Sequence, residues 1–318
     1  MTELERYLAE EVAEDHVDGI ITRREAMRRL GMLGLSTAAA SSMIAAEAHA
    51  RATGKGGGHH HGNDGKETTW APPPAQSIEF AGKRGKLLAS WAPATKPRGG
   101  VLVIHENRGL TAHITHVARR WAASGWSALA LDLLSEEGGT GSFPDEAAVA
   151  AALSAISGDP KSTRFVDDMK FAVTELGKRV GRRSPLGATG FCFGGGMVWN
   201  LLAAREPRLS AAAPFYGPFP TGGSLKGNQA NVLGVYAGND DRVNATRAAA
   251  RAALDAARLD YELLTFAEQP QPPTNPPTYL VGHAFFNDTG TRFNPAAAEE
   301  AWRRVVSWFN DAGDRDHH

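Results

Sequence analysis

The chain has 318 residues, with 34 Lys and Arg against 35 Asp and Glu, 42% hydrophobic residues and one cysteine. This composition is that of a globular protein, which excludes a wholly disordered or fibrous chain. A single cysteine excludes an intramolecular disulfide and any zinc or iron–sulfur site built from several cysteines. A net charge of −1 offers no electrostatic footprint for a nucleic-acid binder. A globular enzyme or binding module remains.

Residues 1–50 have the pattern of an export signal. An acidic stretch with helical spacing is followed by Arg23, Arg24, Arg28 and Arg29, and then by an uncharged, mildly apolar run over 30–46. The sequence Ala-His-Ala at 48–50 has the small residues of a signal-peptidase site, so we expect cleavage after Ala50. The alternative is a membrane anchor, although a short run rich in Ala, Ser and Gly spans a bilayer poorly.

The pair Arg23-Arg24 resembles a twin-arginine signal, which is recognised by an export machinery that carries folded proteins. Ala26 and Met27 depart from the bulky apolar pair of the strongest versions of that signal. The resemblance implies an exported, extracytoplasmic or periplasmic protein.

Residues 51–76 are expected to form a disordered linker. Its Gly-rich part offers no apolar side chains to bury, and Pro72, Pro73 and Pro74 stiffen its end. His59–His61 and Asp64 could bind a metal ion, but on such a segment a solvated tract is the better interpretation. We therefore expect no metal and no cofactor.

Residues 77–313 show alternating strand and helix patterns and form the predicted globular domain, followed by a tail at 314–318. Short, nearly continuous apolar runs are typical of strands covered by helices on both faces. These runs lie at 100–104, 127–133, 186–191, 210–215 and 231–237, with a further strand at 261–266 and a leading antiparallel hairpin at 78–91. Helical patterns lie at 115–124, 163–180, 194–206, 244–258 and 295–311. The fold class is therefore α/β, with a mostly parallel, doubly wound sheet and its functional residues at the strand exits.

A proline-rich insertion follows the strand at 261–266. The sequence at 269–277 cannot form a helix or a central strand, so we expect a stiff surface loop shortly before His283.

The strongest functional signal is the sequence Gly-Phe-Cys-Phe-Gly at 190–194, between a predicted strand and a predicted helix. A glycine-flanked nucleophile at such a turn is the nucleophile elbow of hydrolases with this kind of sheet. Cys192 would stand at a helix N-terminus, whose partial positive charge favours the thiolate. The alternative is that Cys192 is a small buried core residue.

A thiol nucleophile needs a base, and the base needs an orienting carboxylate, in the chain order nucleophile, acid, histidine. The strand at 231–237 exits into Asp240 and Asp241, and His283 lies in a loop before the last helix. The competing histidines precede the nucleophile. These are His105, His113 and His116, of which the last two are expected on the surface.

The segment His105–Gly109 follows the strand at 100–104 and adds further candidates. In this architecture the loop there supplies one oxyanion-hole amide and the residue after the nucleophile supplies the other, which here are the backbone N–H groups of Asn107 and Phe193. Glu106 in the same loop is a fourth candidate for the site. The alternative to a role in the site is that Glu106 forms a structural ion pair with Arg108 or another arginine.

These motifs together resemble the dienelactone hydrolase family of α/β-hydrolases, over residues 77–311. The resemblance is carried by GFCFGGG, the Asp240 exit, GHAFFNDT and IHENRGL. It implies Cys192 as nucleophile, Asp240 and His283 completing a triad, and Glu106 pairing with the resting thiol. Asp240 matches the family pattern Asp-x-x-Val, which ends here at Val243.

The chain departs from family members that hold a substrate carboxylate with two arginines. Where those members have the first arginine, this chain has Leu133–Glu137, which contains none. Where they have the second, it has Ala284–Asn287, and Arg292 lies farther along. The acidic pair Glu136-Glu137 would repel a carboxylate. Candidate pocket residues are Ser135, Phe285 and Phe286, although aromatic residues near such a turn are more often packing.

The sequence thus favours a cysteine-dependent hydrolase of lactones or carboxylic esters, acting through an acyl-thioester on Cys192. The alternative is a hydrolase-fold binding protein without turnover, and a thiol redox sensor would lack a second, resolving cysteine. The expected partners are a small-molecule ester or lactone and the twin-arginine export machinery, with no nucleic acid. The oligomeric state does not follow from the sequence.

Overall fold

The computed structural model describes residues 3–17, 21–53, 73–159, 162–269 and 279–315. Its chain divides into two compact units, one of residues 1–69 with 141–164 and the other of residues 70–140 with 165–318. Most of the predicted linker, including His59–His61 and Asp64, lies outside the described residues, as does most of the proline-rich insertion. No described helix is long and apolar enough to cross a membrane.

The first unit is helical. It contains α1 (Glu3–Val17), α2 (Arg23–Met32), α3 (Thr37–Thr53) and α5 (Glu146–Ser157), with the short 3₁₀ turn η2 (Thr140–Ser142) at its edge. Small and aliphatic side chains of α1, α2 and α3 pack into one buried cluster, which includes Val12, Leu30 and Ile44. The sequence patterns do not indicate α5, and they place its residues in the globular domain rather than with the N-terminal helices.

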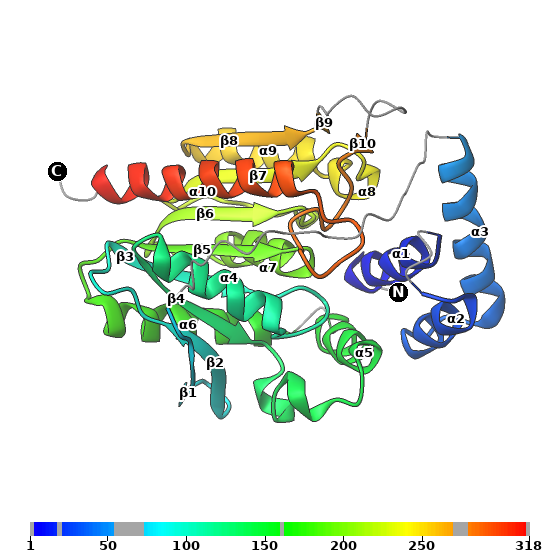
Figure 1. Ribbon diagram of the computed structural model, residues 1–318, viewed down its shortest axis with the longest axis horizontal. Coiled ribbons are helices and arrows are strands. Elements are labelled where there is room, and N and C mark those ends of the chain that lie inside the picture. The colour runs from blue at the N-terminus through cyan, green and yellow to red at the C-terminus, as the bar shows by residue number, and fades with distance from the viewer. Residues whose placement is uncertain (1–2, 18–20, 54–72, 160–161, 270–278, 316–318) are drawn as a thin grey trace. The chain divides into compact units, whose positions relative to one another are not determined.

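The second unit is built on an eight-stranded sheet in the order β1-β2-β4-β3-β5-β6-β7-β8 (Figure 1). The strands are β1 (Gln76–Ala81), β2 (Lys86–Ala92), β3 (Gly99–Ile104), β4 (Trp126–Asp132), β5 (Leu186–Phe191), β6 (Leu209–Phe215), β7 (Asn231–Ala237) and β8 (Tyr261–Phe266). The pairs β1–β2 and β2–β4 are antiparallel, and all others are parallel. The strand order and directions confirm the predicted fold class and the leading hairpin. The predicted apolar strands are also confirmed, and β3 to β7 are buried almost along their whole length.

Helices cover both faces of this sheet. They are α4 (Ala112–Ala123), α6 (Arg164–Val180), α7 (Phe193–Ala203), α8 (Asp241–Asn244), α9 (Arg247–Ala257) and α10 (Pro295–Arg315), and the minor elements are η1 (Ser135–Glu137), β9 (Glu268–Gln269) and β10 (Tyr279–Leu280). A Cβ on Gly187 would meet Phe309 of α10, whereas a Cβ on Gly100 would meet Leu176 of α6. Because Val101, the neighbour of Gly100, is in register with Gly187, α6 and α10 lie on opposite faces.

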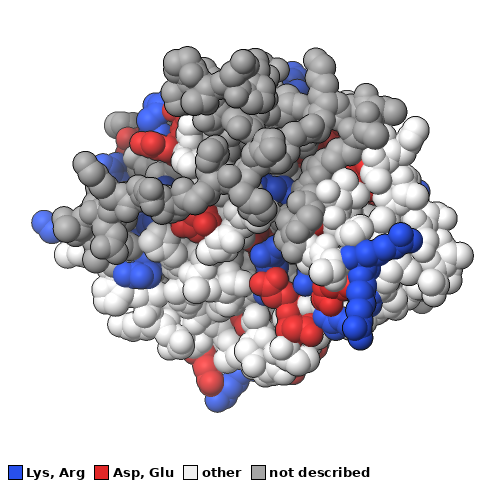
Figure 2. Space-filling model, turned by 45° about the vertical axis from the view of Figure 1, so that its right-hand side comes forward, with Lys and Arg blue, Asp and Glu red and all other residues white. Residues whose placement is uncertain are grey.

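The core between α4, α10 and the sheet is aromatic. The Trp121 ring lies 4.9 Å from that of Trp302 and 4.7 Å from that of Phe309, so α4 and α10 share one face of the sheet. Figure 1 shows these two helices in front of the strands. Charges of both signs are interspersed on the face shown in Figure 2, in keeping with the small net charge.

Candidate active site

Cys192 lies at the turn between β5 and α7 and has an unusual backbone. Its φ is 56° and its ψ is −119°, and it is the N-cap of α7. A positive φ in a residue with a Cβ costs energy and persists only where the surrounding structure imposes it, which is common at functional sites. The Cys192 N–H donates to the Phe215 carbonyl at 3.1 Å, and its carbonyl accepts from Gly196. The turn therefore has the geometry expected of a nucleophile elbow.

The glycines around Cys192 are required by close backbone contacts. A Cβ on Gly190 would lie 2.2 Å from the Gly194 carbonyl oxygen, and a Cβ on Gly194 would lie 2.4 Å from that of Ile104. Neither neighbour is a flexible side chain that could move aside. The turn is thus held tightly between β3, β5 and α7.

His283 and Asp240 lie together at the ends of two segments. The Nδ1 atom of His283 is 2.6 Å from Oδ2 of Asp240, and both side chains are buried. An isolated parallel bridge between Asn239 and Gly282 places them side by side. The other carboxylate oxygen of Asp240 accepts from the backbone N–H of Val243 at the start of α8. Asp241, the second candidate acid, is exposed.

The imidazole of His283 also lies near the sulfur of Cys192. Sγ of Cys192 and a ring nitrogen of His283 are within 4.8 Å of each other. Since Nδ1 is bound to Asp240, Nε2 is the nitrogen left for the thiol. The residue after the histidine, Ala284, has φ of 61°, and the Tyr216 ring packs edge-on to His283 at 5.0 Å. The structure therefore brings the predicted nucleophile, acid and base together.

His105 is a structural histidine rather than a competing base. Its Nε2 accepts from the Leu133 N–H at 3.1 Å, so its Nδ1 carries the proton and donates to the Glu106 carbonyl at 2.6 Å. Burial lowers the pKa of His105, which keeps the ring neutral. The ring joins the exits of β3 and β4 and fixes the backbone at Glu106.

Glu106 is buried, and its carboxyl group contacts the loop that carries His283. Oε2 accepts from Nδ2 of Asn287 at 2.6 Å, whereas Oε1 has no hydrogen-bond partner among the described residues. Burial raises the pKa of Glu106 above its ordinary value of 4.5. The hydrogen bond to Glu106 thus comes from an amide, whereas Arg108, the ion-pair partner considered from the sequence, acts on this carboxyl group through its charge.

Asn107 and Phe193 follow the β3 exit and the nucleophile, as the sequence predicts. Neither backbone amide donates to an acceptor among the described residues. Gly109, two residues after Asn107, has φ of 79°, and the Leu110 N–H donates to Thr140, whose hydroxyl is bound to Asp132. The loop with the Asn107 amide is therefore anchored to the β4 exit.

The expectation that His113 lies on the surface is wrong. His113 is 5% exposed, and its Nδ1 lies 2.7 Å from Oδ1 of Asp288. The carboxylate is far away in the sequence, so no local pattern indicated the pair. The hydrogen bond from His113 lowers the pKa of Asp288. His116 is half-buried, and burial lowers its pKa.

The three candidate pocket residues are engaged in packing or backbone bonds. The Ser135 hydroxyl donates to the Asp132 carbonyl and accepts from the Leu88 N–H at 2.9 Å. The Phe285 ring packs on Tyr216 and Phe266. All three side chains are buried, so the structure favours packing, the alternative left open by the sequence.

Phe286 and Glu136 are also held by other side chains. The Phe286 ring stacks on that of Phe191 at 5.1 Å and contacts Phe215. Glu136 forms an ion pair with Arg84 at 2.7 Å. The negative charge of Glu136 is therefore partly compensated within the second unit.

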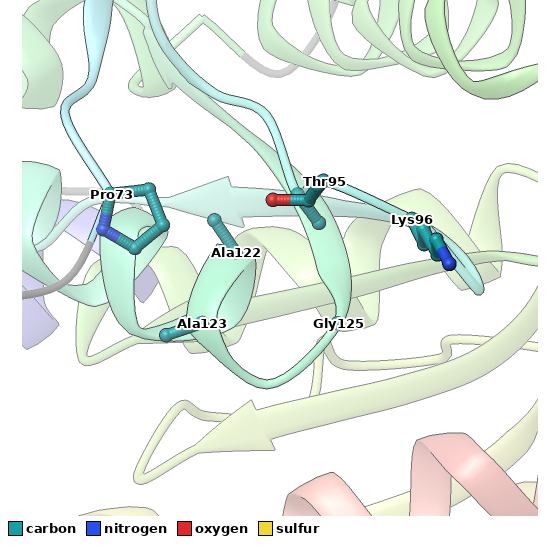
Figure 3. A pocket seen from close by; sticks show the side chains of 7 residues that line it. Pro73, Thr95, Lys96, Ala122, Ala123 and Gly125 are labelled. Carbon is teal, nitrogen blue, oxygen red and sulfur yellow. The ribbon is translucent and has the colours of Figure 1, made fainter.

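An open surface hollow lies at the other edge of the sheet (Figure 3). Apart from Pro73, which precedes β1, its lining residues precede β3 and β4 or end α4, so it lies at the amino-terminal ends of these two strands and away from Cys192. It is lined by Pro73, Ala94, Thr95, Lys96, Ala122, Ala123 and Gly125. With Lys96 as the one titratable side chain in this lining, the hollow lacks the acid–base pairs found at the opposite edge.

The sheet order and the strand-exit site define an α/β-hydrolase. The model of the dienelactone hydrolase family matches residues 87–313, and the chain belongs to this family. It is a hydrolase of the carboxylic ester and lactone class.

Relatives and solved structures agree with this assignment. A protein of Escherichia coli (strain K12) named "Putative carboxymethylenebutenolidase" is 29% identical over 226 residues, covering 68% of this chain and 78% of the relative. A dienelactone hydrolase-like promiscuous phosphotriesterase from metagenomic libraries aligns with a TM-score of 0.63 at 22% identity, covering 76% of this chain and 99% of that structure. The dienelactone hydrolase of Anabaena variabilis ATCC 29413 aligns with a TM-score of 0.53 at 18% identity, covering 76% and 99%. At these identities the two structures support the fold.

Proposed function

We propose that the chain hydrolyses lactones or carboxylic esters through an acyl-thioester on Cys192. The observation that carries the proposal is His283, whose ring lies between the Asp240 carboxylate at 2.6 Å and the Cys192 sulfur within 4.8 Å. An imidazole in this position can stabilise the thiolate and later act as general base toward water, while the carboxylate fixes its tautomer.

Acylation begins when the Cys192 thiol gives its proton to Glu106 and the resulting thiolate, stabilised by His283, attacks the carbonyl carbon. The negative charge that forms on the carbonyl oxygen is stabilised by the amides of Asn107 and Phe193, which donate to no other described acceptor. The tetrahedral intermediate collapses to the thioester, and the leaving group departs as a stable enolate or phenolate that takes up the proton held by Glu106.

Deacylation uses the same groups. Water loses a proton to Nε2 of His283 and attacks the thioester carbon, and collapse releases the carboxylic acid and the Cys192 thiol. Glu106 is proposed to pair with the resting thiol and to accept its proton when substrate binds. The raised pKa of Glu106, caused by burial, suits a group that holds a proton in one state and releases it in another.

The proposed substrates have good leaving groups and neutral acyl parts. A thiolate leaves readily, so a tetrahedral intermediate with a poor alkoxide would expel sulfur again, whereas an enolate or phenolate would leave first. Asn287 and not arginine follows His283 in the second region and binds Glu106. Asn287 therefore offers no positive charge to a substrate carboxylate.

The test is hydrolysis of p-nitrophenyl acetate, followed by a panel of neutral and carboxylated lactones and aryl esters. Cys192→Ala is expected to abolish turnover, and mass spectrometry of the wild type with a slow substrate should show one acyl group on Cys192. Activity that survives Cys192→Ala would rule out the proposal. Ligand binding without turnover in the wild type would instead favour the binding-protein alternative.

We further propose that residues 1–50 direct export by the twin-arginine machinery. The support is the pattern of Arg23-Arg24, an apolar run and Ala48-His49-Ala50, and both arginines are exposed in the first unit. Replacing both arginines by lysine should retain the protein in the cytoplasm, measured by fractionation and by the mass of the N-terminus. The same substitution of Arg28 and Arg29 is the control for loss of charge alone.

A further inference from the structure

Two consecutive residues of the loop after His283 hold two titratable side chains of the segment after β3. Nδ2 of Asn287 donates to Oε2 of Glu106 at 2.6 Å, and Oδ1 of Asp288 lies 2.7 Å from Nδ1 of His113. The partners are 181 and 175 residues apart in the chain. The loop with the proposed base is thus tied directly to the loop with the proposed oxyanion-hole amide.

The amide of Asn287 can have one orientation only. Its Oδ1 accepts from the backbone N–H of Thr289 at 3.0 Å and from the Thr289 hydroxyl at 2.7 Å. Flipping the amide would turn its NH₂ group toward these two donors and its oxygen toward the carboxyl group of Glu106. Asn287 is 4% exposed, so water would not compensate for these losses.

This orientation makes the two oxygens of Glu106 unequal. Oε2 accepts the Asn287 donor, so a proton on the neutral carboxyl group belongs on Oε1, which is buried and has no partner among the described residues. We propose that Asn287 is a positioning residue that keeps the proton of Glu106 on Oε1 and sets the pH at which Glu106 ionises. The inference rests on the proposed function, in which Glu106 exchanges a proton with the site, and it adds the residue that controls this exchange.

The charges around Glu106 oppose one another. Burial favours the neutral acid and is the largest influence on its pKa. The ionised form is favoured by Arg108 of the same loop, by His113 of α4, and by Asn287 and His283 of the facing loop. Asp288 is the further charged group on that loop, and its contact is with His113. The amide hydrogen bond from Asn287 therefore acts with these charges and against burial.

The experiment measures the ionisation of Glu106 itself. The infrared carbonyl band of a protonated carboxyl group is followed with pH, and the band of Glu106 is assigned by its loss in Glu106→Gln. Asn287→Leu removes the donor to the ionised form, and Asn287→Asp places a second carboxyl group against the first. Both substitutions should raise the pH midpoint of the Glu106 ionisation by about one unit or more. Thr289→Val removes one of the two donors that orient the amide and should cause a smaller shift in the same direction.

The matched control is Asn310→Leu, which removes another side-chain hydrogen bond, the one at 2.9 Å from Trp126 in the core around α10. Its midpoint should equal that of the wild type. Midpoints of Asn287→Leu and Asn287→Asp that differ from the control by less than a few tenths of a unit would overturn the proposal. If Asn287→Leu does not fold, the isosteric Asn287→Asp and the milder Thr289→Val decide the outcome.

The titration does not require ester hydrolysis, so the two proposals can fail separately. Esterase activity remaining in Cys192→Ala would remove the proposed function and leave the Glu106 midpoints intact. If both proposals hold, one limb of the pH profile of kcat/KM in Asn287→Asp should shift together with the infrared midpoint. A purely structural role for Asn287 would lower activity at all pH values equally.

Discussion

The Nδ1 atom of His283 lies 2.6 Å from Oδ2 of Asp240, and this contact joins two loops separated by 43 residues of chain. Asp240 has a second task, since its other oxygen caps α8 through the Val243 N–H. The carboxylate is therefore fixed by the fold before it orients the imidazole, which is the preorganisation that a base beside a thiol needs.

Asp240→Asn should lower kcat/KM for p-nitrophenyl acetate by about 10³-fold or more, because an amide can leave the histidine in the wrong tautomer. The amide would still cap α8, so the thermal midpoint should change little. Asp241→Asn, at the exposed neighbouring position, is the control and should remain within twofold of the wild type. Equal losses in the two variants would contradict the assignment of the acid.

Gly190→Ala should destabilise the protein by about 1–3 kcal/mol or prevent folding, because its Cβ would lie 2.2 Å from the Gly194 carbonyl oxygen. Circular dichroism melts of purified protein give the shift. Gly85→Ala is the matched control, since a Cβ there would meet nothing within 4 Å. Wild-type stability of Gly190→Ala would show that the turn is looser than the structure has it.

The difference in stability between Glu106→Gln and the wild type should favour the variant more at pH 8 than at pH 5. In the folded state burial raises the pKa of Glu106 above 4.5, so its neutral form contributes stability at low pH. That contribution is lost as the pH rises from 4.5 through the folded pKa, by about 1.4 kcal/mol for each unit of the shift. Glutamine does not ionise and avoids this loss.

Thermal melts of both proteins at the two pH values measure the difference for Glu106. The gain should be accompanied by lost activity, as expected where a buried carboxyl group is kept for function. A gain that is equal at pH 5 and pH 8 would show that folding does not shift the ionisation of Glu106 as argued.

The elements found from the sequence are those whose signal is local. Strands β3 to β7 are continuous apolar runs, and the turn at Cys192 carries its own glycines, so neither needed knowledge of distant residues. The choice of Asp240 over Asp241 came from the family pattern, and the structure separates the two by burial, 5% exposed for Asp240. Physical reasoning from the sequence alone left both acids open.

The contacts missed from the sequence are long-range. His113 was expected on the surface because it is polar, although it lies four residues before Val117 on the buried face of α4, and its polar partner Asp288 is 175 residues away. In the sequence, Asn287 stands out only because it lies in a region where other family members have an arginine. Its hydrogen bond to Glu106 depends on how two distant loops meet. Helix α5 is rich in alanine with little amphipathic contrast, so its pattern did not distinguish it from a connection.

Arg120→Met should lower the free energy of unfolding by about 1–2 kcal/mol and also reduce kcat. The guanidinium carbon of Arg120 lies 4.3 Å from the centre of the Trp302 ring and 5.3 Å from that of Phe286, in a largely buried position where such contacts are strong. Phe286 belongs to the loop of His283, so losing this stack loosens the loop between the proposed base and Asn287. Arg120→Lys keeps the charge but not the planar stack and should fall between wild type and Arg120→Met.

Denaturant unfolding and steady-state kinetics measure the two effects of Arg120. Arg303→Met is the control, since Arg303 pairs with Glu300 on the exposed side of α10, the helix that carries Trp302. It should cost less than about 0.5 kcal/mol without changing kcat. If Arg120→Met loses stability but keeps wild-type kcat, the stack supports the core without fixing the histidine loop. A loss of kcat that grows with temperature well below the melting transition would instead identify the loop as the part that Arg120 holds in place.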